Sequence, residues 1–300
     1  MNTRNFFALM ISAVVLCSFS SCDKDDDNKQ EEEKQEVKIE NSDSFEGYFL
    51  ASGSGQDLMF EKKSFKLEKK SDGIYQIVIP EFTYQGNSMT MKEFVVDSLN
   101  VSGNTFTKEF AVVDDANKYN KGTLTLKLSD DKKVESFVYS NQYGNMPFAI
   151  NFTYYNSVAA KVQGSYSDNL NYSVSFGTSS VSLNTDAQII IKENDEKVDI
   201  TFPELQYGKS TMPSFTVTEV EVSYENGQFN FKPLNFNITD KENTEKKHEG
   251  EIISGSLVNG KLKINYTDKY GNMPHAVTYN FGVEKTENST EGENPHTSQK

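Results

Sequence analysis

YGNMP at residues 143–147 returns unchanged at residues 270–274, and this repeat decides how the chain is organised. Each copy is followed by a segment in which apolar or aromatic side chains stand at alternate positions. Earlier in the chain, IPEFTY at residues 79–84 corresponds to FPELQY at residues 202–207. Matches that recur in the same order predict an internal duplication, in which the chain contains two copies of one structural unit.

A third match marks the beginning of each copy. GYF at residues 47–49 corresponds to GSY at residues 164–166. The offset between matched segments grows from 117 to 123 to 127 residues along the chain, as small insertions in the second copy would produce. We therefore expect two similar domains, at residues 44–157 and 160–283, joined by a very short link.

Within each copy the hydrophobic pattern has the period of a β-strand. LTLKL at residues 124–128, VDITF at 198–202 and LKINY at 262–266 alternate cleanly. Asn-Gly pairs at residues 226–227 and 259–260 are suited to tight hairpin turns. The pattern predicts an all-β fold with about eight antiparallel strands per copy and no convincing helix. An up-and-down barrel is favoured because closure removes exposed strand edges, and an open sandwich is the alternative.

The N-terminal segment has the features of a lipoprotein signal. Arg4 precedes an apolar run at residues 6–19, which is shorter than the roughly 20 residues needed to span a bilayer. Small residues then precede Cys22. We predict a signal peptide at residues 1–21, whose removal leaves Cys22 as the lipid-bearing first residue. The alternative is an ordinary secretory peptide with an incidental cysteine.

Charged and polar segments flank the two copies. Residues 22–43 contain the lipidated cysteine and an acidic stretch too charged to fold, which predicts a disordered tether. The acids directly after Cys22 resemble the export signal of surface lipoproteins of Bacteroidota-type bacteria. This resemblance implies an outer-membrane protein that is lipid-anchored and exposed on the cell surface. Residues 284–300 are polar and lack periodicity, which predicts a disordered tail.

Composition excludes several classes of function. The formal net charge is −14 and Arg4 is the only arginine, which argues against a nucleic-acid partner. Cys17 and Cys22 are the only cysteines, and neither remains as a free thiol after processing. A cysteine nucleophile and a zinc–thiolate site are therefore excluded, and we expect no cofactor and no metal.

Candidate catalytic groups do not recur in both copies. His248, His275 and His296 all lie in the second copy or after it, so a histidine mechanism would exist there alone. Glu81 and Glu204 do recur, but no second carboxylate stands at matched positions, as glycoside chemistry would need. We therefore predict that the protein is not an enzyme.

Several of these features resemble one family. The Gly-x-aromatic openings at residues 47–49 and 164–166, the segments that lead to Met89 and Met212, and the Asn-Gly-Lys hairpin at residues 259–261 are similar to calycin-like β-barrel lipoproteins of Bacteroidota, which are related in shape to lipocalins. The resemblance implies two tandem calycin-like barrels and little about activity. Lipocalins proper carry a Trp in the opening motif and a capping Arg, and this chain has neither after processing.

The loop after the central strand supplies the candidate ligand-binding residues. Tyr84 and Met89 in the first copy, and Tyr207 and Met212 in the second, are five residues apart. Such a loop could cover an apolar interior, since Met adapts its shape and Tyr adds a polar tip to an apolar ring. The alternative is that the loop fills the barrel with its own side chains.

Two functions remain open. The first is a non-catalytic binding module, held in the membrane by lipid on Cys22, for a small apolar or glycan ligand; it predicts an interior void above about 300 Å³. The second is a structural or accessory surface protein that binds a protein partner through the outer faces of its barrels. That function predicts an exposed apolar patch.

Overall fold

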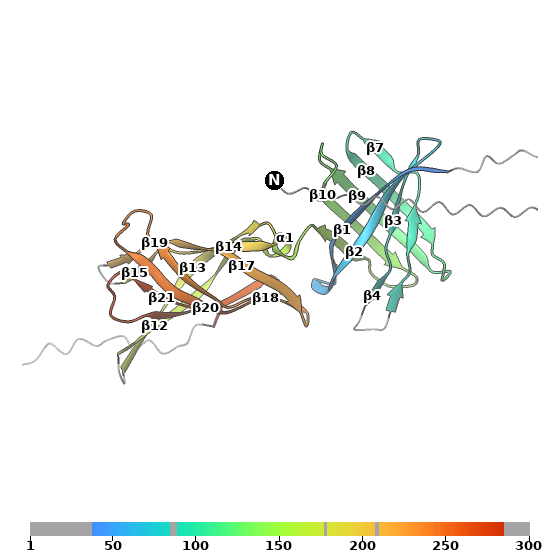
Figure 1. Ribbon diagram of the computed structural model, residues 1–300. Helices are drawn as coiled ribbons and strands as arrows, with labels where there is room; N and C mark the ends of the chain where they lie inside the picture. The colour runs from blue at the N-terminus through green and yellow to red at the C-terminus, as the bar shows by residue number, and fades with distance from the viewer. Residues whose placement is uncertain (1–37, 85–88, 177–178, 208–209, 285–300) are drawn as a thin grey trace, which may run out of the picture. The chain divides into compact units, whose positions relative to one another are not determined.

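A computed structural model shows an all-β chain built around two nine-stranded antiparallel sheets (Figure 1). It describes residues 38–84, 89–176, 179–207 and 210–284. The predicted signal peptide, Cys22 and the C-terminal tail beyond Glu284 lie outside the described residues. Among those that are described, no helix is long and apolar enough to cross a membrane.

The first sheet lies between Ile39 and Tyr155 and has the strand order β6-β3-β2-β1-β11-β10-β9-β8-β7. Its strands are β1 (Ile39–Gly53), β2 (Gln56–Lys70), β3 (Tyr75–Ile79), β6 (Phe94–Val96), β7 (Asn100–Ser102), β8 (Thr105–Val113), β9 (Tyr119–Leu128), β10 (Val134–Tyr143) and β11 (Ile150–Tyr155). A separate hairpin consists of β4 (Phe82–Tyr84) and β5 (Met89–Met91). The two outermost strands, β6 and β7, are neighbours in the chain.

The second sheet has the order β18-β17-β14-β13-β12-β22-β21-β20-β19. This order repeats that of the first sheet except at the fifth strand in chain order, which pairs with the following strand in the first sheet (β7 with β8) and with the preceding strand in the second (β18 with β17). Its strands are β12 (Gly164–Phe176), β13 (Ser179–Asn194), β14 (Lys197–Phe202), β17 (Phe215–Glu225), β18 (Gln228–Phe231), β19 (Leu234–Thr239), β20 (Lys247–Val258), β21 (Lys261–Tyr270) and β22 (Val277–Phe281). Because β18 also pairs with β20, the second sheet closes into a ring. The matching hairpin consists of β15 (Leu205–Tyr207) and β16 (Ser210–Met212). The predicted all-β, antiparallel barrel fold is confirmed.

One short helix was not predicted from the sequence. It is α1 (Val158–Val162), which lies between the last strand of the first sheet and the first strand of the second. The Ser157 hydroxyl accepts a hydrogen bond from the Ala160 amide at 2.8 Å, which caps the helix. Five residues are too few to produce a helical hydrophobic period, so the pattern gives no signal here.

Aromatic side chains fill the interior of both barrels. In the first, the fully buried Phe49 ring lies 5.3 Å from the Phe82 ring and 5.8 Å from the Phe137 ring. In the second, the Tyr266 ring lies 4.1 Å from the Phe202 ring and stacks on a further tyrosine. These rings occupy the space in which an interior ligand would need a void.

A glycine at matched positions of the two sheets allows neighbouring strands to approach each other closely. A Cβ at Gly122 would lie 1.8 Å from the Ser140 carbonyl oxygen, and a Cβ at Gly250 would lie 1.9 Å from the Thr267 carbonyl oxygen. Real Cβ atoms do not come so close to a backbone atom, so only glycine fits. Both copies therefore have a glycine at the same position of the sheet, where two strands approach closely.

Candidate functional site

The first predicted site hairpin packs its base into the core of the first barrel. Tyr84 and Met89 face each other across β4 and β5, and both are half-buried. The next pair, Phe82 and Met91, points inward, and the two side chains are 1% and 2% exposed. The hairpin thus contributes side chains to the core at its base. The ligand-binding role of Tyr84 and Met89 stays a prediction.

The second hairpin aligns differently from the sequence match. Leu205 pairs with Met212 as Phe82 pairs with Met91, so Met212 corresponds to Met91 rather than to Met89. Met212 is 2% exposed, and its sulfur accepts a hydrogen bond from the Tyr279 hydroxyl at 3.3 Å. The equal spacing of Tyr and Met was misleading because the second loop is two residues shorter.

For Tyr207, the structure describes only the backbone, which pairs with Ser210. Its side chain lies outside the described set. The ligand-binding role predicted for Tyr207 and Met212 therefore stays a prediction as well.

A buried polar cluster in the second barrel was not found by sequence reasoning. His248 Nδ1 lies 2.8 Å from Asp268 Oδ2, and the two side chains are 1% and 0% exposed. Burial raises the pKa of Asp268, because the charged carboxylate is removed from water. The Tyr270 ring packs against His248, and its hydroxyl donates a hydrogen bond to Asp240. Burial together with this bond raises the pKa of Tyr270 to about 12.

The first barrel has a matched cluster in which two asparagines stand in place of the histidine and the aspartate. Asn120 pairs with Tyr143 across the strands as His248 pairs with Tyr270. The Asn141 side-chain amide donates to the Asn120 side-chain oxygen at 2.8 Å. Aligning the two copies over this strand pair, in addition to the motifs, would have revealed the exchange of an Asn–Asn pair for a His–Asp pair. Because the pair is enclosed by the core, it does not form an accessible catalytic site.

The wall of the second barrel has a gap between β17 and β19. Along β17, residues 215–221 pair with β14 and residues 222–225 pair with β18. Among the described residues, β19 pairs with β20 alone. The Lys232 amide donates to the Glu221 carbonyl at 3.0 Å, and in the part of the chain that the structure describes the facing edges of β17 and β19 are not paired beyond this bond. We call this gap the seam.

Two backbone features produce the seam. Pro233 lies between β18 and β19, where its missing N–H and restricted φ interrupt the strand. Glu219 has a φ of +59°, and the register between β17 and β14 shifts there. The Asp199 side chain accepts a hydrogen bond from the displaced Glu219 amide at 3.1 Å. The strands therefore diverge on one side of the Lys232–Glu221 bond.

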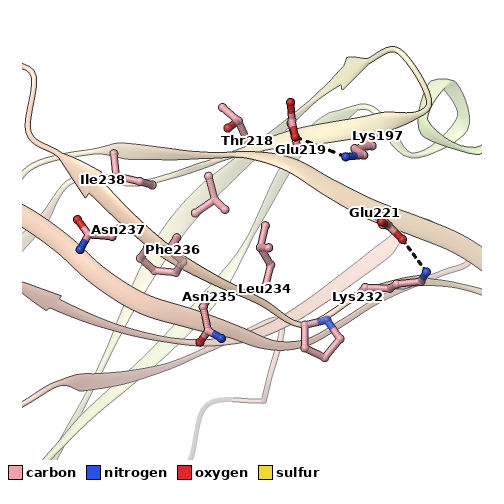
Figure 2. Close-up of a pocket in the computed structure, with 12 residues that line it drawn as sticks. Lys197, Thr218, Glu219, Glu221, Lys232, Leu234, Asn235, Phe236, Asn237 and Ile238 are labelled. Atoms are coloured by element: carbon pink, nitrogen blue, oxygen red, sulfur yellow. Dashed lines mark hydrogen bonds and ion pairs between the residues drawn. The ribbon is translucent and has the colours of Figure 1, made fainter.

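The seam holds a groove of about 430 Å³, which we call the seam groove (Figure 2). Its floor consists of inward-facing apolar side chains: Val217, Leu234, Phe236 and Ile238. Its rim consists of polar and charged side chains together with Pro233: Lys197, Thr218, Glu219, Glu221, Lys232, Asn235 and Asn237. Figure 2 shows Leu234 and Phe236 directed into the space between the strands. An apolar floor with a few polar groups is typical of small-molecule sites.

The charges on the rim neutralise one another. Lys232 Nζ lies 2.6 Å from Glu221 Oε2, and Lys197 Nζ lies 3.4 Å from Glu219 Oε2. The hydrogen bond between Lys232 and Glu221 lowers the pKa of that carboxyl and raises the pKa of the ammonium group. Because each lysine has an acidic neighbour, the rim favours an uncharged ligand over an anion or a cation.

The floor of the seam groove rests on the buried cluster. The Phe236 ring lies 5.4 Å from the Phe215 ring, which in turn stacks on His248 at 4.2 Å. These packed rings hold the floor of the groove in place.

The first barrel closes the equivalent gap with a lysine. Lys108 pairs with Leu124 as Leu234 pairs with Ile252, so Lys108 stands where the groove has Leu234. The Lys108 ammonium donates to the Ser98 carbonyl at 2.8 Å. Ser98, with a φ of +56°, corresponds to Glu219. A charged side chain thus crosses the first seam at the position where an apolar side chain lines the second.

Comparison with known proteins supports this fold. Residues 162–283 match the family model of the calycin-like beta-barrel domain, so the second half of the chain contains a calycin-like β-barrel. The family resemblance expected for both copies is thereby shown for the second. No curated protein matches the chain.

One solved structure is similar over most of the chain. It is a crystal structure described as a "putative outer membrane protein" from Bacteroides fragilis, with 20% sequence identity and a TM-score of 0.41. The similarity covers 81% of this chain and 97% of that one.

Proposed function

We propose that this protein is a lipid-anchored, non-catalytic binding module of the bacterial cell surface, and that its second barrel binds a small, uncharged, largely apolar molecule in the seam groove. The observation that carries the proposal is the groove itself. It combines a volume of about 430 Å³ with an apolar floor and a charge-neutral rim. Ligand pockets have volumes of roughly 300–1,000 Å³ and this kind of lining.

The filled interiors direct the proposal to the barrel wall. A lipocalin-like ligand would lie inside the barrel, where Phe49 in the first half and Tyr266 in the second are completely buried among other rings. A ligand in the seam groove needs no interior void. It would cover Leu234, which is only half-buried, and the partly exposed Ile238.

The anchor and location are proposed from the N-terminal sequence. A short apolar run, small residues before Cys22 and acids directly after it support removal of residues 1–21, lipidation of Cys22 and display on the outer membrane. Incorporation of labelled fatty acid into the wild-type chain, and its loss in Cys22→Ser, tests the anchor. Protease sensitivity of intact cells tests surface display.

A second candidate function rests on the first barrel. Val113 and Tyr119 face each other across β8 and β9 and are 56% and 50% exposed. Exposed neighbouring apolar side chains are suited to contact with a protein partner. This observation supports the structural or accessory alternative, in which the first barrel binds a surface protein.

The seam groove can be tested with a neutral lipophilic dye, N-phenyl-1-naphthylamine, and the chain lacking residues 1–22. We expect dye fluorescence to rise on binding to the wild-type chain. In Leu234→Lys, which introduces the lysine of the first barrel, the ammonium group enters the groove and binding should weaken by at least about tenfold. Ser254→Ala, on an exposed strand position outside the groove, is the control. Equal binding by wild type and Leu234→Lys would contradict the proposal.

A further inference from the structure

A row of amide side chains runs across adjacent strands on the outer face of the second barrel. Asn171 on β12 pairs with Asn184 on β13 and, on its other side, with Asn280 on β22. Asn280 pairs in turn with Asn265 on β21. Four neighbouring strands therefore carry an asparagine at the same level. We call these four residues the amide row.

The polar row continues onto the next two strands. Ser254 on β20 stands opposite Asn265, and Ser256 on the same strand pairs with Asn230 on β18. The Gln228 side chain donates to the Asn230 side-chain oxygen at 2.8 Å. Hydroxyl and amide groups thus follow one another around a large part of the barrel, without a carboxylate among them.

The amide row lies outside the barrel because inward and outward side chains alternate along each strand. On β21, Ile264 and Tyr266 on either side of Asn265 are 2% and 0% exposed. On β22, Tyr279 and Phe281 on either side of Asn280 are 0% and 1% exposed. The two asparagines therefore point away from the core, on the face that contacts solvent.

Such a row opposes the intrinsic preferences of a β-sheet. Asparagine is depleted in strands, where β-branched and aromatic residues are favoured. At the matched positions of the first barrel, the cross-strand set is Leu50, Thr153 and Val138 in place of Asn171, Asn280 and Asn265. Of these, Thr153 and Val138 follow the strand preference at positions that are not buried, whereas Leu50 is buried, with 8% of its surface exposed. The second barrel has asparagine at all three positions. A departure of this kind, repeated on adjacent strands, indicates a functional constraint.

A groove accompanies the amide row. It has a volume of about 360 Å³, and its lining includes Asn230, Ser254, Ser256, Lys263, Asn265 and Asn280. Lys263 is the one charged side chain of this lining. The side-chain oxygen of Asn265 is buried and has no hydrogen-bond partner within the described part of the chain. A buried acceptor of this kind normally receives a hydrogen bond.

We propose that the amide row and its groove form a second binding site, which takes a neutral glycan. An amide both donates and accepts hydrogen bonds, as a sugar hydroxyl does, so the two match without any net charge. Strands spaced about 4.8 Å apart present these amides at regular intervals, which suits an extended chain of hydroxyl-bearing units. With no tryptophan in the sequence, recognition relies on hydrogen bonds rather than on a stacking platform.

This site is separate from the seam groove. Its lining comes from β18, β20, β21, β22 and Val283, whereas the seam groove is lined by residues of β17 and β19, by Lys197 at the start of β14, and by Lys232 and Pro233. The two grooves have no lining residue in common. Failure of one proposal therefore leaves the other intact.

The test is affinity electrophoresis of the chain lacking residues 1–22 through gels that contain dextran, yeast mannan or barley β-glucan, with hyaluronan as the anionic comparison. We expect at least one neutral polysaccharide to retard the wild-type chain and hyaluronan to leave its mobility unchanged. The double variant Asn265→Val with Asn280→Thr introduces the residues of the first barrel. It should weaken the interaction by about tenfold, because two hydrogen-bonding groups are lost.

Two controls keep the test specific. The double variant raises the strand preference of both positions, so its circular dichroism and thermal unfolding should match those of the wild type. Leu234→Lys, in the seam groove, should retain full retardation. The proposal is overturned if none of the three neutral polysaccharides retards the wild-type chain, or if the double variant is retarded as strongly as the wild type.

Discussion

The two halves of the chain have similar barrels and differ at the seam, where we propose that the second half binds a ligand. Apart from β7 and β18, the strands follow the same order in both sheets, and Gly122 and Gly250 allow the same close approach. At the seam, however, Lys108 in the first half is replaced by Leu234 in the second. The two halves therefore share the glycine at this close approach and differ at a position that lines the seam groove.

The same contrast holds inside the barrel. The Asn120–Asn141 pair of the first half is neutral, while the His248–Asp268 pair of the second can carry charge. The His248 ring of this pair stacks on the Phe215 ring, on which the floor of the seam groove rests. The second half thus differs from the first both in the groove and in the packing behind it.

The largest expected effect tests whether the two cores are equivalent. Tyr139→Ala removes a ring stacked on Phe152 at 4.4 Å, and Tyr266→Ala removes one stacked on Tyr279 at 4.5 Å. Each substitution should reduce the free energy of unfolding of its own half by about 4 kcal/mol. Urea denaturation followed by circular dichroism measures this loss. A loss below about 1 kcal/mol in one half would show that the two cores are not equivalent.

A smaller loss is expected at the matched glycines. Gly122→Ala and Gly250→Ala each place a Cβ within 2 Å of a carbonyl oxygen, which forces the strands apart. We expect each to cost about 2–3 kcal/mol in urea denaturation. Ser254→Ala, at an exposed position, is the control and should change stability by less than about 0.5 kcal/mol. A glycine variant as stable as that control would refute the close approach.

The buried carboxyl should make the second half sensitive to pH. Because burial raises the pKa of Asp268 in the folded state, the folded protein holds this proton more tightly than the unfolded chain does. The wild type should therefore lose stability as the pH rises from about 4, where an unperturbed Asp titrates, through the raised pKa. In Asp268→Asn, which introduces the residue of the first half, this loss should be absent.

Unfolding in urea at pH 4 and pH 7 measures how the free energy of unfolding of each variant changes with pH. Asn141→Ala, in the first half, is the control, because it removes no titrating group. From pH 4 to pH 7, we expect the free energy of unfolding of Asp268→Asn to rise relative to that of the wild type. This rise should be smaller than the loss caused by the core substitutions. A gap between Asp268→Asn and wild type that is the same at both pH values would show that Asp268 does not titrate as described.

The smallest effect on stability, and a new binding activity, is expected at the first seam. Lys108→Leu removes the ammonium group that donates to the Ser98 carbonyl and introduces the leucine of the second seam. We expect stability to change by less than about 1 kcal/mol, since Lys108 is only half-buried. Combined with Leu234→Lys, this variant should bind N-phenyl-1-naphthylamine through the first half. If it stays unable to bind the dye, more than this lysine closes the first seam.

The fold could be predicted because its signals are local or repeated. Strand alternation and the YGNMP repeat at residues 143–147 and 270–274 indicate two antiparallel β-units before any contact is known. The helix α1 was missed because its five residues span little more than one turn. Met212 was matched to Met89 rather than Met91 because a difference in loop length cannot be read from spacing alone.

The seam groove could not be predicted for a different reason. It exists because Pro233 interrupts one strand and Glu219 adopts a positive φ on another, and the two lie 14 positions apart in the sequence. Which strands fail to pair depends on how the sheet closes, and closure is a long-range property. Asn265 and Asn280 look like ordinary polar strand residues until the register places them side by side.

Native mass spectrometry of the chain lacking residues 1–22, after incubation with a bacterial lipid extract, tests most directly whether the second half binds a small molecule at its seam. The account predicts a discrete adduct on the wild-type chain that disappears on denaturation, persists in Asn265→Val with Asn280→Thr, and is absent from Leu234→Lys. A wild-type chain that carries no adduct, or an adduct of equal intensity on Leu234→Lys, would contradict it.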